Sequence, residues 1–396
     1  MDSSIRDRHA PATIAPAATA LASRRPKQSD YDRSPHVAFY EVTRACDLVC
    51  VHCRACAQPR SDPRELATAQ SLALIEQLAE FPQPPILVLT GGDPFKRADL
   101  FALVSRAVGR GLETSITPSA TPLVTRDALA RLHDLGVRRI AVSLDGPTAE
   151  SHDAVRGVEG SFARTLEIAA DARRCGLEVQ VNTTLTPANV GEIEHIADVL
   201  DGLNVVLWSV FFLVPVGRAD ILPRLDAAQC EAAFARLWQV AQTHAFGLKT
   251  TEAPHYRRFI AQAATDERRN SRAAEALQPQ GRASSGESVP ANRDGAHRFR
   301  PLGTNDGKGI LFVSHVGEIY PSGFMPVRCG TFPDDHVVSV YQRSPLFRQL
   351  RDASNLEGKC GDCEFRNLCG GSRARSYAAT GNPFAEEPDC VYQPTR

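Results

Sequence analysis

Three closely spaced cysteines carry the strongest chemical signal in the sequence. Cys46, Cys50 and Cys53 follow the spacing C-x3-C-x2-C, directly after a predicted strand. Three thiolates this close can hold one small inorganic core and leave one metal position open for a ligand from outside the protein. The spacing favours an iron-sulfur cluster. The alternatives are a zinc site completed by Cys56 or His52, and buried thiols without a metal.

A second group of cysteines lies near the end of the chain. Cys360, Cys363 and Cys369 follow the spacing C-x2-C-x5-C, and Cys390 comes 21 positions later. Four ligands complete the coordination of a cluster, so this group has no open position for a small molecule. Four thiolates are also what structural zinc prefers, and zinc is the alternative here.

Short apolar runs and helical patterns alternate six times from residue 36 onward. The predicted strands are Val37–Thr43, Ile86–Thr90, Glu113–Thr117, Arg139–Leu144, Glu178–Thr184 and Val205–Phe212. Asp99, Thr125 and Asn189 are predicted to cap helices between them. This alternation predicts an α/β fold whose parallel sheet is either doubly wound or curled into a barrel of fewer than eight units. Ligands of such sheets bind at the carboxyl ends of the strands.

Small and polar residues follow several of these strands. Each group alone is typical of an ordinary turn. Together they fall at the same end of the predicted sheet as the first three cysteines, which makes them candidate ligand-binding residues. They are Gly91, Gly92 and Asp93 after the second strand, Ser143 and Asp145 after the fourth, Asn182 and Thr184 on the fifth, and Gly217 after the sixth.

The rest of the chain has a different composition. We predict a disordered tail over 1–35, a helical linker over 221–306 with a mobile insertion at about 266–300, and a C-terminal α+β domain over 307–396. Two short strands, Gly309–Ser314 and Glu318–Tyr320, are expected in that last domain.

The composition excludes some functions. Lys and Arg number 45 and Asp and Glu 46, so the net charge of -1 provides no broad field for binding nucleic acid or an anionic membrane. No apolar run approaches the roughly 20 residues of a membrane-spanning helix. Eleven cysteines without a recognisable secretion signal favour a reducing, cytoplasmic location in which cysteines bind metals or catalyse reactions.

With these residues noted, the sequence resembles the radical S-adenosylmethionine (SAM) enzymes over roughly residues 36–220. The hallmark of that family is C-x3-C-x2-C after the first strand of a partial (β/α)6 barrel. The resemblance implies that Cys46, Cys50 and Cys53 hold three irons of a 4Fe-4S cluster and that SAM chelates the fourth. His52 departs from the family, in which an aromatic ring usually precedes the third cysteine.

The resemblance also assigns SAM-binding roles. Gly91, Gly92 and Asp93 would bind the methionine amino group, Ser143 and Asp145 would face the ribose or the carboxylate, and Arg156 would pair with the carboxylate. The backbone from Val214 to Gly217 would face the adenine, with Asn182 nearby.

The C-terminal cysteines resemble those of the SPASM or twitch extension of radical SAM enzymes, in which such a quartet holds an auxiliary 4Fe-4S cluster. The full SPASM pattern has seven cysteines and two auxiliary clusters. Ser322 and Ser372 stand where ligands of the other cluster are expected. The sequence therefore predicts one auxiliary cluster.

The resemblance implies a reductant such as ferredoxin or flavodoxin, and cleavage of SAM to a 5'-deoxyadenosyl radical that abstracts hydrogen. Relatives of this type act on tetrapyrrole precursors of heme or on ribosomal peptides. The segment from Cys363 to Tyr377 looks like the tetrapyrrole group, and Arg373 and Arg375 are candidate partners for substrate carboxylates. We expect a tetrapyrrole substrate, with peptide maturation as the alternative and a non-enzymatic iron-sulfur protein as a distant one.

Overall fold

The computed structural model describes residues 31–276 and 303–395, with side chains described for 31–265 and 303–395. Residues 1–30, which make up most of the predicted disordered tail, lie outside the described residues. Residues 277–300 of the predicted mobile insertion also lie outside them. The end of the tail is packed against the C-terminal domain, contrary to the prediction. Tyr31 is buried, its carbonyl accepts a hydrogen bond from Tyr341 Oη at 2.8 Å, and Asp32 accepts one from Arg351 Nε at 3.0 Å.

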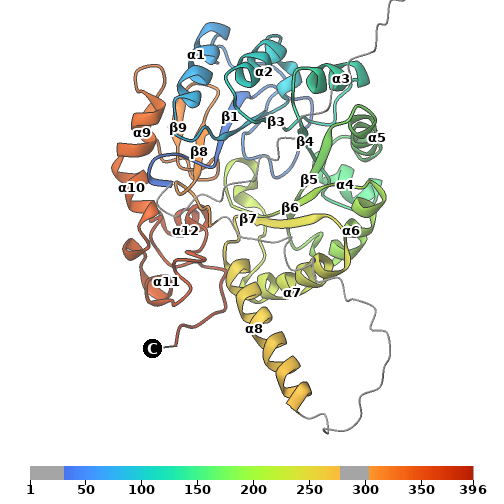
Figure 1. Cartoon of the computed structure of the whole chain (residues 1–396). Coiled ribbons are helices and arrows are strands. Elements are labelled where there is room, and N and C mark those ends of the chain that lie inside the picture. The colour runs from blue at the N-terminus through green and yellow to red at the C-terminus, as the bar shows by residue number, and fades with distance from the viewer. Residues whose placement is uncertain (1–30, 277–302, 396) are drawn as a thin grey trace, which may run out of the picture.

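A single sheet of ten strands organises the described chain (Figure 1). Its strand order is β10-β9-β8-β1-β2-β3-β4-β5-β6-β7. The strands β8 and β1 to β7 are parallel to one another, whereas β9 and β10 add an antiparallel edge. The strands are β1 Val37–Thr43, β2 Ile86–Gly91, β3 Thr114–Ile116, β4 Arg139–Ser143, β5 Glu178–Leu185, β6 Leu207–Phe212, β7 Gly247–Thr251, β8 Ile310–Val313, β9 Glu318–Tyr320 and β10 Gly330–Thr331.

The predicted α/β class and the six parallel strands are confirmed, but the sheet is larger than predicted. The strand β7 lies inside the segment predicted to be a helical linker, and it pairs with β6 in parallel. Only Leu248 of this five-residue strand is fully buried. A single buried residue gives no alternation of apolar and polar positions from which a strand could be predicted. The strand β8 pairs in parallel with β1, so the sheet continues into the C-terminal segment.

Helices of the first two-thirds of the chain cover the outer face of the curved sheet (Figure 1). They are α1 Thr68–Ala79, α2 Leu100–Gly109, α3 Arg126–Asp134, α4 Ala149–Arg156, α5 Ser161–Arg174, α6 Ile193–Gly202 and α7 Ala227–Thr243. The next helix, α8 His255–Ala276, extends away from the sheet, and the C-terminal segment contains α9 Val337–Arg343, α10 Pro345–Arg351, α11 Gly358–Asp362 and α12 Arg373–Thr380 (Figure 1). Residues 266–276, predicted to belong to the mobile insertion, continue α8 as helix. No helix among the described residues is long and apolar enough to cross a membrane.

All three predicted capping residues occupy N-cap positions, but only one makes the side-chain hydrogen bond of a cap. Thr125 accepts a hydrogen bond from the backbone N–H of Ala128, as an N-cap does. Asp99 precedes α2, but its carboxylate accepts a hydrogen bond from Arg97 Nε at 2.6 Å and none from the helix. Asn189 uses its side-chain amide to bind the carbonyls of Asp145 and Thr184, and so supports a loop of the candidate site.

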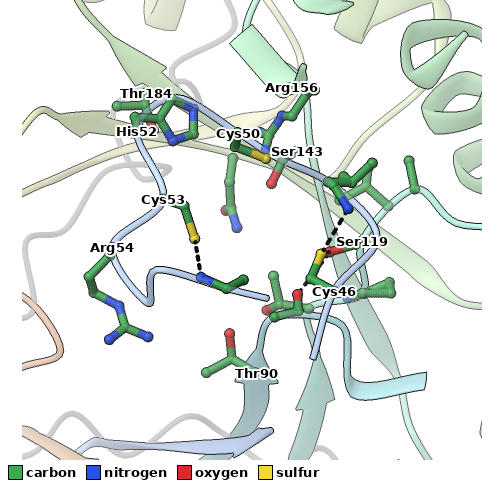
Figure 2. Close-up of a pocket in the computed structure, with 18 of the residues that line it drawn as sticks. Cys46, Cys50, His52, Cys53, Arg54, Thr90, Ser119, Ser143, Arg156 and Thr184 are labelled. Carbon is green, nitrogen blue, oxygen red and sulfur yellow. Dashed lines mark hydrogen bonds between the residues drawn. The ribbon is translucent and has the colours of Figure 1, made fainter. Parts of the chain in front are cut away.

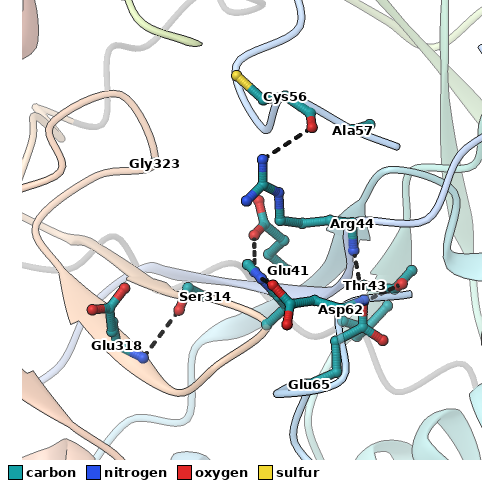
Figure 3. A network of polar contacts seen from close by, with 12 residues as sticks. Glu41, Thr43, Arg44, Cys56, Ala57, Asp62, Glu65, Ser314, Glu318 and Gly323 are labelled. Atoms are coloured by element: carbon teal, nitrogen blue, oxygen red, sulfur yellow. Dashed lines mark hydrogen bonds and ion pairs between the residues drawn. The ribbon is translucent and has the colours of Figure 1, made fainter. Parts of the chain in front are cut away.

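A buried ion pair joins the first strand to the C-terminal segment. Glu41 on β1 accepts hydrogen bonds from Arg54 Nη2 at 2.6 Å and from His315 Nδ1 at 2.7 Å. The Arg54 guanidinium also lies 4.7 Å from the ring centre of Phe312 on β8. Figure 3 shows Glu41 at the centre of this region, with Asp62 close by. The cysteine loop, β1 and β8 therefore share one network.

We predict that Glu41→Gln lowers the free energy of unfolding by about 3 kcal/mol at neutral pH, because it leaves the half-buried Arg54 and the buried His315 without their charged partner. Burial opposes ionisation of Glu41, but Arg54 and His315 outweigh it and lower the pKa from 4.5 to about 2. The carboxylate therefore stabilises the fold fully above pH 4.5, and this contribution is lost as the pH falls toward 2.

Urea unfolding at several pH values measures this contribution. The matched control is Glu76→Gln, which breaks exposed ion pairs with Arg106 and Arg110 and is expected to cost about 0–1 kcal/mol. Equal losses for the two variants at neutral pH, or a Glu41→Gln deficit that grows in acid, would contradict the assignment.

Candidate iron-sulfur sites

A cavity of about 1000 Å³, part of it open to solvent, lies at the carboxyl ends of the parallel strands. Figure 2 shows the three cysteines of the first group around it. The structure brings eight of the predicted site residues together on the cavity wall: Cys46, Cys50, Cys53, Gly91, Gly92, Ser143, Arg156 and Asn182. These residues come from the loop after β1, from β2, β4 and β5, and from α4.

The sulfurs of this cysteine loop accept hydrogen bonds. The donors are the backbone N–H of Leu48 to Cys46 Sγ at 3.4 Å, the backbone N–H of Ala57 to Cys53 Sγ at 3.4 Å, and Arg156 Nη1 to Cys50 Sγ at 3.6 Å. Ser119 Oγ also lies 3.3 Å from Cys46 Sγ. Hydrogen bonds donated to sulfur favour the thiolate, which is the form that binds metal.

Three other cysteines direct Sγ toward a backbone carbonyl, as protonated thiols do. Cys175 Sγ lies 3.6 Å from the carbonyl of Arg126, Cys230 Sγ 3.8 Å from that of Leu225, and Cys329 Sγ 3.5 Å from that of Val327. Cys230 Sγ also accepts a hydrogen bond from Arg375 Nη2 at 3.9 Å, but burial outweighs this contact and raises the pKa of Cys230 to about 12. All eleven cysteines lie in the described residues and form no disulfide.

Two glycines let neighbouring loops approach the cysteine loop closely. A Cβ added to Gly92 would lie 2.4 Å from the carbonyl oxygen of Ala45, and one added to Gly217 would lie 2.7 Å from that of Cys53. Gly217 also has φ +65°, a conformation that favours glycine. Next to it, Arg218 Nε donates to the carbonyl of Cys50 at 2.8 Å. The loop after β6 therefore holds the cysteine loop from one side.

Asp145 positions Arg156 from behind the cavity wall. Its buried carboxylate lies 2.5 Å from Arg156 Nη2 and 3.0 Å from His52 Nε2, and it accepts the backbone N–H of Thr184 at 2.8 Å. Burial opposes the charge, but Arg156 and then His52 hold the pKa of Asp145 well below its usual range. Arg156 Nε is buried without a hydrogen-bond partner among the described residues. Arg156 thus keeps one donor for a bound anion.

Four predicted site residues do not line this cavity. Asp93 is fully buried, and its carboxylate accepts hydrogen bonds from Thr121 Oγ1 at 2.6 Å and from the backbone N–H of Phe95 at 3.1 Å. Burial raises the pKa of Asp93, although these bonds oppose the rise. Asp145, Val214 and Gly217 also lie behind the wall. In this structure these four residues lie in the layer behind the cavity wall and contact the residues that form it.

The sequence analysis missed Ser119, which also lines the cavity. Ser119 follows β3, and its hydroxyl donates to the carbonyl of Gly92 at 2.8 Å. Examining the end of every predicted strand would have found it. Thr90 and Thr184, near the ends of β2 and β5, line the cavity as well. Phe324 comes from the C-terminal segment, and no local pattern marks it.

The second cysteine group surrounds a smaller cavity of about 370 Å³, lined by Cys360, Cys363, Cys369 and Cys390. Backbone N–H groups again point at sulfur, from Glu387 to Cys360, from Phe365 to Cys363 and from Gly371 to Cys369, at 3.3 to 3.4 Å. Burial raises the pKa of Cys369 to about 12, so a thiolate there needs a nearby cation.

Both cysteine groups have room for a core of several atoms, because their sulfurs are arranged around cavities. A structural zinc ion is smaller, and four cysteine or histidine ligands hold it, with each sulfur about 2.3 Å from the metal.

Ser322 and Ser372 take part in protein hydrogen bonds instead of lining the smaller cavity. Ser372 Oγ donates to Glu252 Oε2 at 2.6 Å, and Ser322 Oγ accepts the backbone N–H of Phe324 at 3.1 Å. Arg373 and Arg375, expected to bind substrate, are buried and engaged in the same region. Arg375 pairs with Glu387 and Asp389, and Arg373 donates to two backbone carbonyls. Both guanidinium groups are therefore held by protein partners in this structure.

Comparisons with known proteins agree with this geometry. Residues 40–200 match the model of the radical SAM superfamily. The AdoMet-dependent heme synthase of Oleidesulfovibrio alaskensis is 36% identical over 92% of this chain and 90% of its own. The protein of the same name from Methanosarcina barkeri is 34% identical over 91% of this chain and 97% of its own. The fold and the cysteine loop define a radical SAM protein, and the chain belongs to that superfamily.

The fold is also found in a solved structure. Streptococcus suis SuiB, solved bound to S-adenosylmethionine and also to the precursor peptide SuiA, is similar with a TM-score of 0.66 over 91% of this chain. The match covers 78% and 76% of SuiB in the two structures, at 15% identity. This likeness extends the shared fold beyond residues 40–200 into the C-terminal segment.

We predict that Asp145→Asn weakens SAM binding at least ten-fold and lowers the free energy of unfolding by about 3 kcal/mol, because Arg156 loses the buried charge that orients it. Calorimetric titration of the reconstituted protein with SAM and anaerobic urea unfolding provide the two measurements. The control is Glu150→Gln, an exposed carboxylate in the first turn of α4. Unchanged SAM affinity in Asp145→Asn would contradict the role given to Arg156.

Proposed function

We propose that this radical SAM enzyme oxidises side chains of a propionate-bearing tetrapyrrole on a route to heme. The observation that carries the proposal is the similarity to proteins named AdoMet-dependent heme synthase, which extends over nine-tenths of the chain. The cavity geometry supports it independently. We further propose a cytoplasmic location and a ferredoxin or flavodoxin as reductant.

The first cavity suits a 4Fe-4S cluster with SAM. Cys46, Cys50 and Cys53 would hold three irons and leave the fourth for SAM. When bound and reduced, this pair supplies a 5'-deoxyadenosyl radical that removes a hydrogen atom from the substrate. The protein aligns the reacting atoms: Arg156 pairs with the SAM carboxylate, while Gly91 and Gly92 let the cofactor approach the backbone of β2.

The same cavity has features that suit a carboxylate-bearing aromatic ring system. Phe211 at the end of β6 and Phe324 of the C-terminal segment lie with ring centres 6.1 Å apart. Arg54 and Arg218 line the wall beside them. Aromatic side chains pack against flat rings, and guanidinium groups bind carboxylates. A propionate-bearing tetrapyrrole offers both kinds of group.

A cluster in the second cavity would supply the electron acceptor that this reaction requires. Removing one hydrogen atom from a propionate leaves a carbon radical, and releasing carbon dioxide to form a double bond requires the loss of one further electron. A one-electron acceptor is therefore needed. A 4Fe-4S cluster held by Cys360, Cys363, Cys369 and Cys390 has this capacity and has no open position for SAM.

We predict that wild-type protein reconstituted anaerobically holds about eight irons and that two sets of cysteine variants each remove about four. Replacing Cys46, Cys50 and Cys53 together with Ala should abolish 5'-deoxyadenosine formation with dithionite and SAM, because the open iron is lost. Cys360→Ala should lose the other cluster and retain part of the SAM cleavage.

Iron analysis and chromatographic detection of 5'-deoxyadenosine measure these effects. Cys175→Ser is the matched control, because its thiol points at a carbonyl outside both cavities. Zinc in the C-terminal site, close to twelve irons in the wild type, or wild-type 5'-deoxyadenosine from the triple variant would each contradict the assignment.

We predict that iron-coproporphyrin stimulates SAM cleavage and loses carbon dioxide, as followed by mass spectrometry alongside 5'-deoxyadenosine. Phe324→Ala should weaken binding of this porphyrin at least ten-fold, because it removes one of the two aromatic rings on the wall. Phe365→Ala, which removes an aromatic ring at the second cavity, is the control for loss of an aromatic residue. Conversion of a short peptide, without binding of any tetrapyrrole, would show that the enzyme is a peptide maturase.

A further inference from the structure

His255 is a buried side chain for which the proposed radical chemistry has no role. It is the first residue of α8, is fully buried and lines the second cavity together with the four C-terminal cysteines. In Figure 1, α8 begins beside the C-terminal segment and runs away from it. The imidazole ring of His255 lies edge-on against the ring of Phe234, with ring centres 4.7 Å apart, so packing fixes the orientation of the imidazole.

The imidazole of His255 lacks a hydrogen-bond partner in the described protein. Neither Nδ1 nor Nε2 makes a hydrogen bond of good geometry within the described residues. The backbone of Asp389 is near enough to act as a weak acceptor and to raise the pKa of the ring, although burial has a larger, opposite effect. A neutral imidazole carries one N–H. A buried donor without a well-aligned acceptor costs about 1–3 kcal/mol, so a bound group that offers a better acceptor would stabilise this imidazole.

The surroundings of His255 are otherwise suited to an anionic group. Arg258, one turn further along α8, lines the same cavity, and its Nε is also buried without a hydrogen-bond partner among the described residues. Lys359 lies on the wall too, although its Nζ donates to the carbonyl of Cys390. The first turn of α8 adds backbone N–H groups at this end. Desolvation, followed by Arg375 and Arg258, lowers the pKa of His255 and keeps the ring neutral.

We propose that His255 donates a hydrogen bond to a sulfur atom of the auxiliary cluster and thereby raises the reduction potential of that cluster. This inference rests on the proposed four-cysteine cluster and deepens it. Reduction adds negative charge to the cluster, and an N–H directed at sulfur stabilises the reduced form more than the oxidised form. His255 thus acts through the cluster and not on the substrate. By raising the reduction potential, it makes the cluster a better acceptor for the electron that the substrate radical must lose.

The experiment measures the potential of the auxiliary cluster by itself. The full chain with Cys46, Cys50 and Cys53 replaced by Ala contains only this cluster, so electron paramagnetic resonance during a redox titration reports one couple. His255→Phe retains a ring of similar size and removes the N–H. His255→Asn keeps a donor. His244→Phe, at the end of α7 and in contact with Phe246, is the control for exchanging a histidine outside the cavity.

His255→Phe should retain about four irons and lower the potential. The expected change in the ratio of oxidised to reduced cluster at fixed potential is ten-fold or more, which is about 59 mV for a one-electron couple. His255→Asn should recover part of the shift, and His244→Phe should show none. An unchanged potential in His255→Phe with full iron content would overturn the proposal, as would equal shifts in the Phe and Asn variants.

A second measurement needs no substitution of His255. With isotope-labelled histidine, pulsed resonance of the reduced cluster should show a weak coupling to a histidine nitrogen, which His255→Phe removes. No coupling in the wild type would overturn the proposal. A strong coupling, or loss of the irons in His255→Phe, would identify His255 as a ligand and also overturn it. SAM cleavage and porphyrin conversion by the unsubstituted enzyme test the proposed function separately.

Discussion

Three cysteine sulfurs within eight residues, 46–53, two of them on buried residues, must carry negative charge at the same time, and much of the structure meets this requirement. Each sulfur accepts a hydrogen bond from the protein, two from backbone N–H groups and one from Arg156. These bonds require a fixed loop conformation. The neighbouring loops supply it by close contact at Gly92 and Gly217, where any larger residue would overlap a backbone carbonyl.

A layer of paired charges behind the cavity keeps the cationic side chains in place. Asp145 orients Arg156 toward Cys50, and Glu41 holds Arg54 next to Cys53. Because Glu41 also binds His315, the C-terminal segment is connected to the same layer. The second cavity repeats the arrangement on a smaller scale: backbone N–H groups point at its sulfurs, and Arg258 and His255 add donors from α8. Both sites combine anionic sulfur with oriented donors.

The sequence predicted those parts of the fold whose signals are local. Buried strands such as Val37–Thr43 are recognisable as short β-branched runs, and the cysteine spacing locates the first site without a structure. The strand β7 was missed because one buried leucine gives no periodicity. The protein partners of Arg373 and Arg375 could not be predicted, because these carboxylates and carbonyls are ten or more residues away in the sequence and lie in loops. The aromatic wall formed by Phe211 and Phe324 depends on contact between two segments, so local patterns cannot reveal it.

The central claim is that one chain holds two clusters and that only the cluster in the first cavity is open to SAM. Electron paramagnetic resonance of the fully reduced, reconstituted protein, recorded before and after addition of SAM, tests this most directly. The account predicts two overlapping signals, of which SAM changes only the one that depends on Cys46, Cys50 and Cys53. A spectrum that SAM leaves unchanged, or a SAM-induced change in the signal that depends on Cys360, would contradict it.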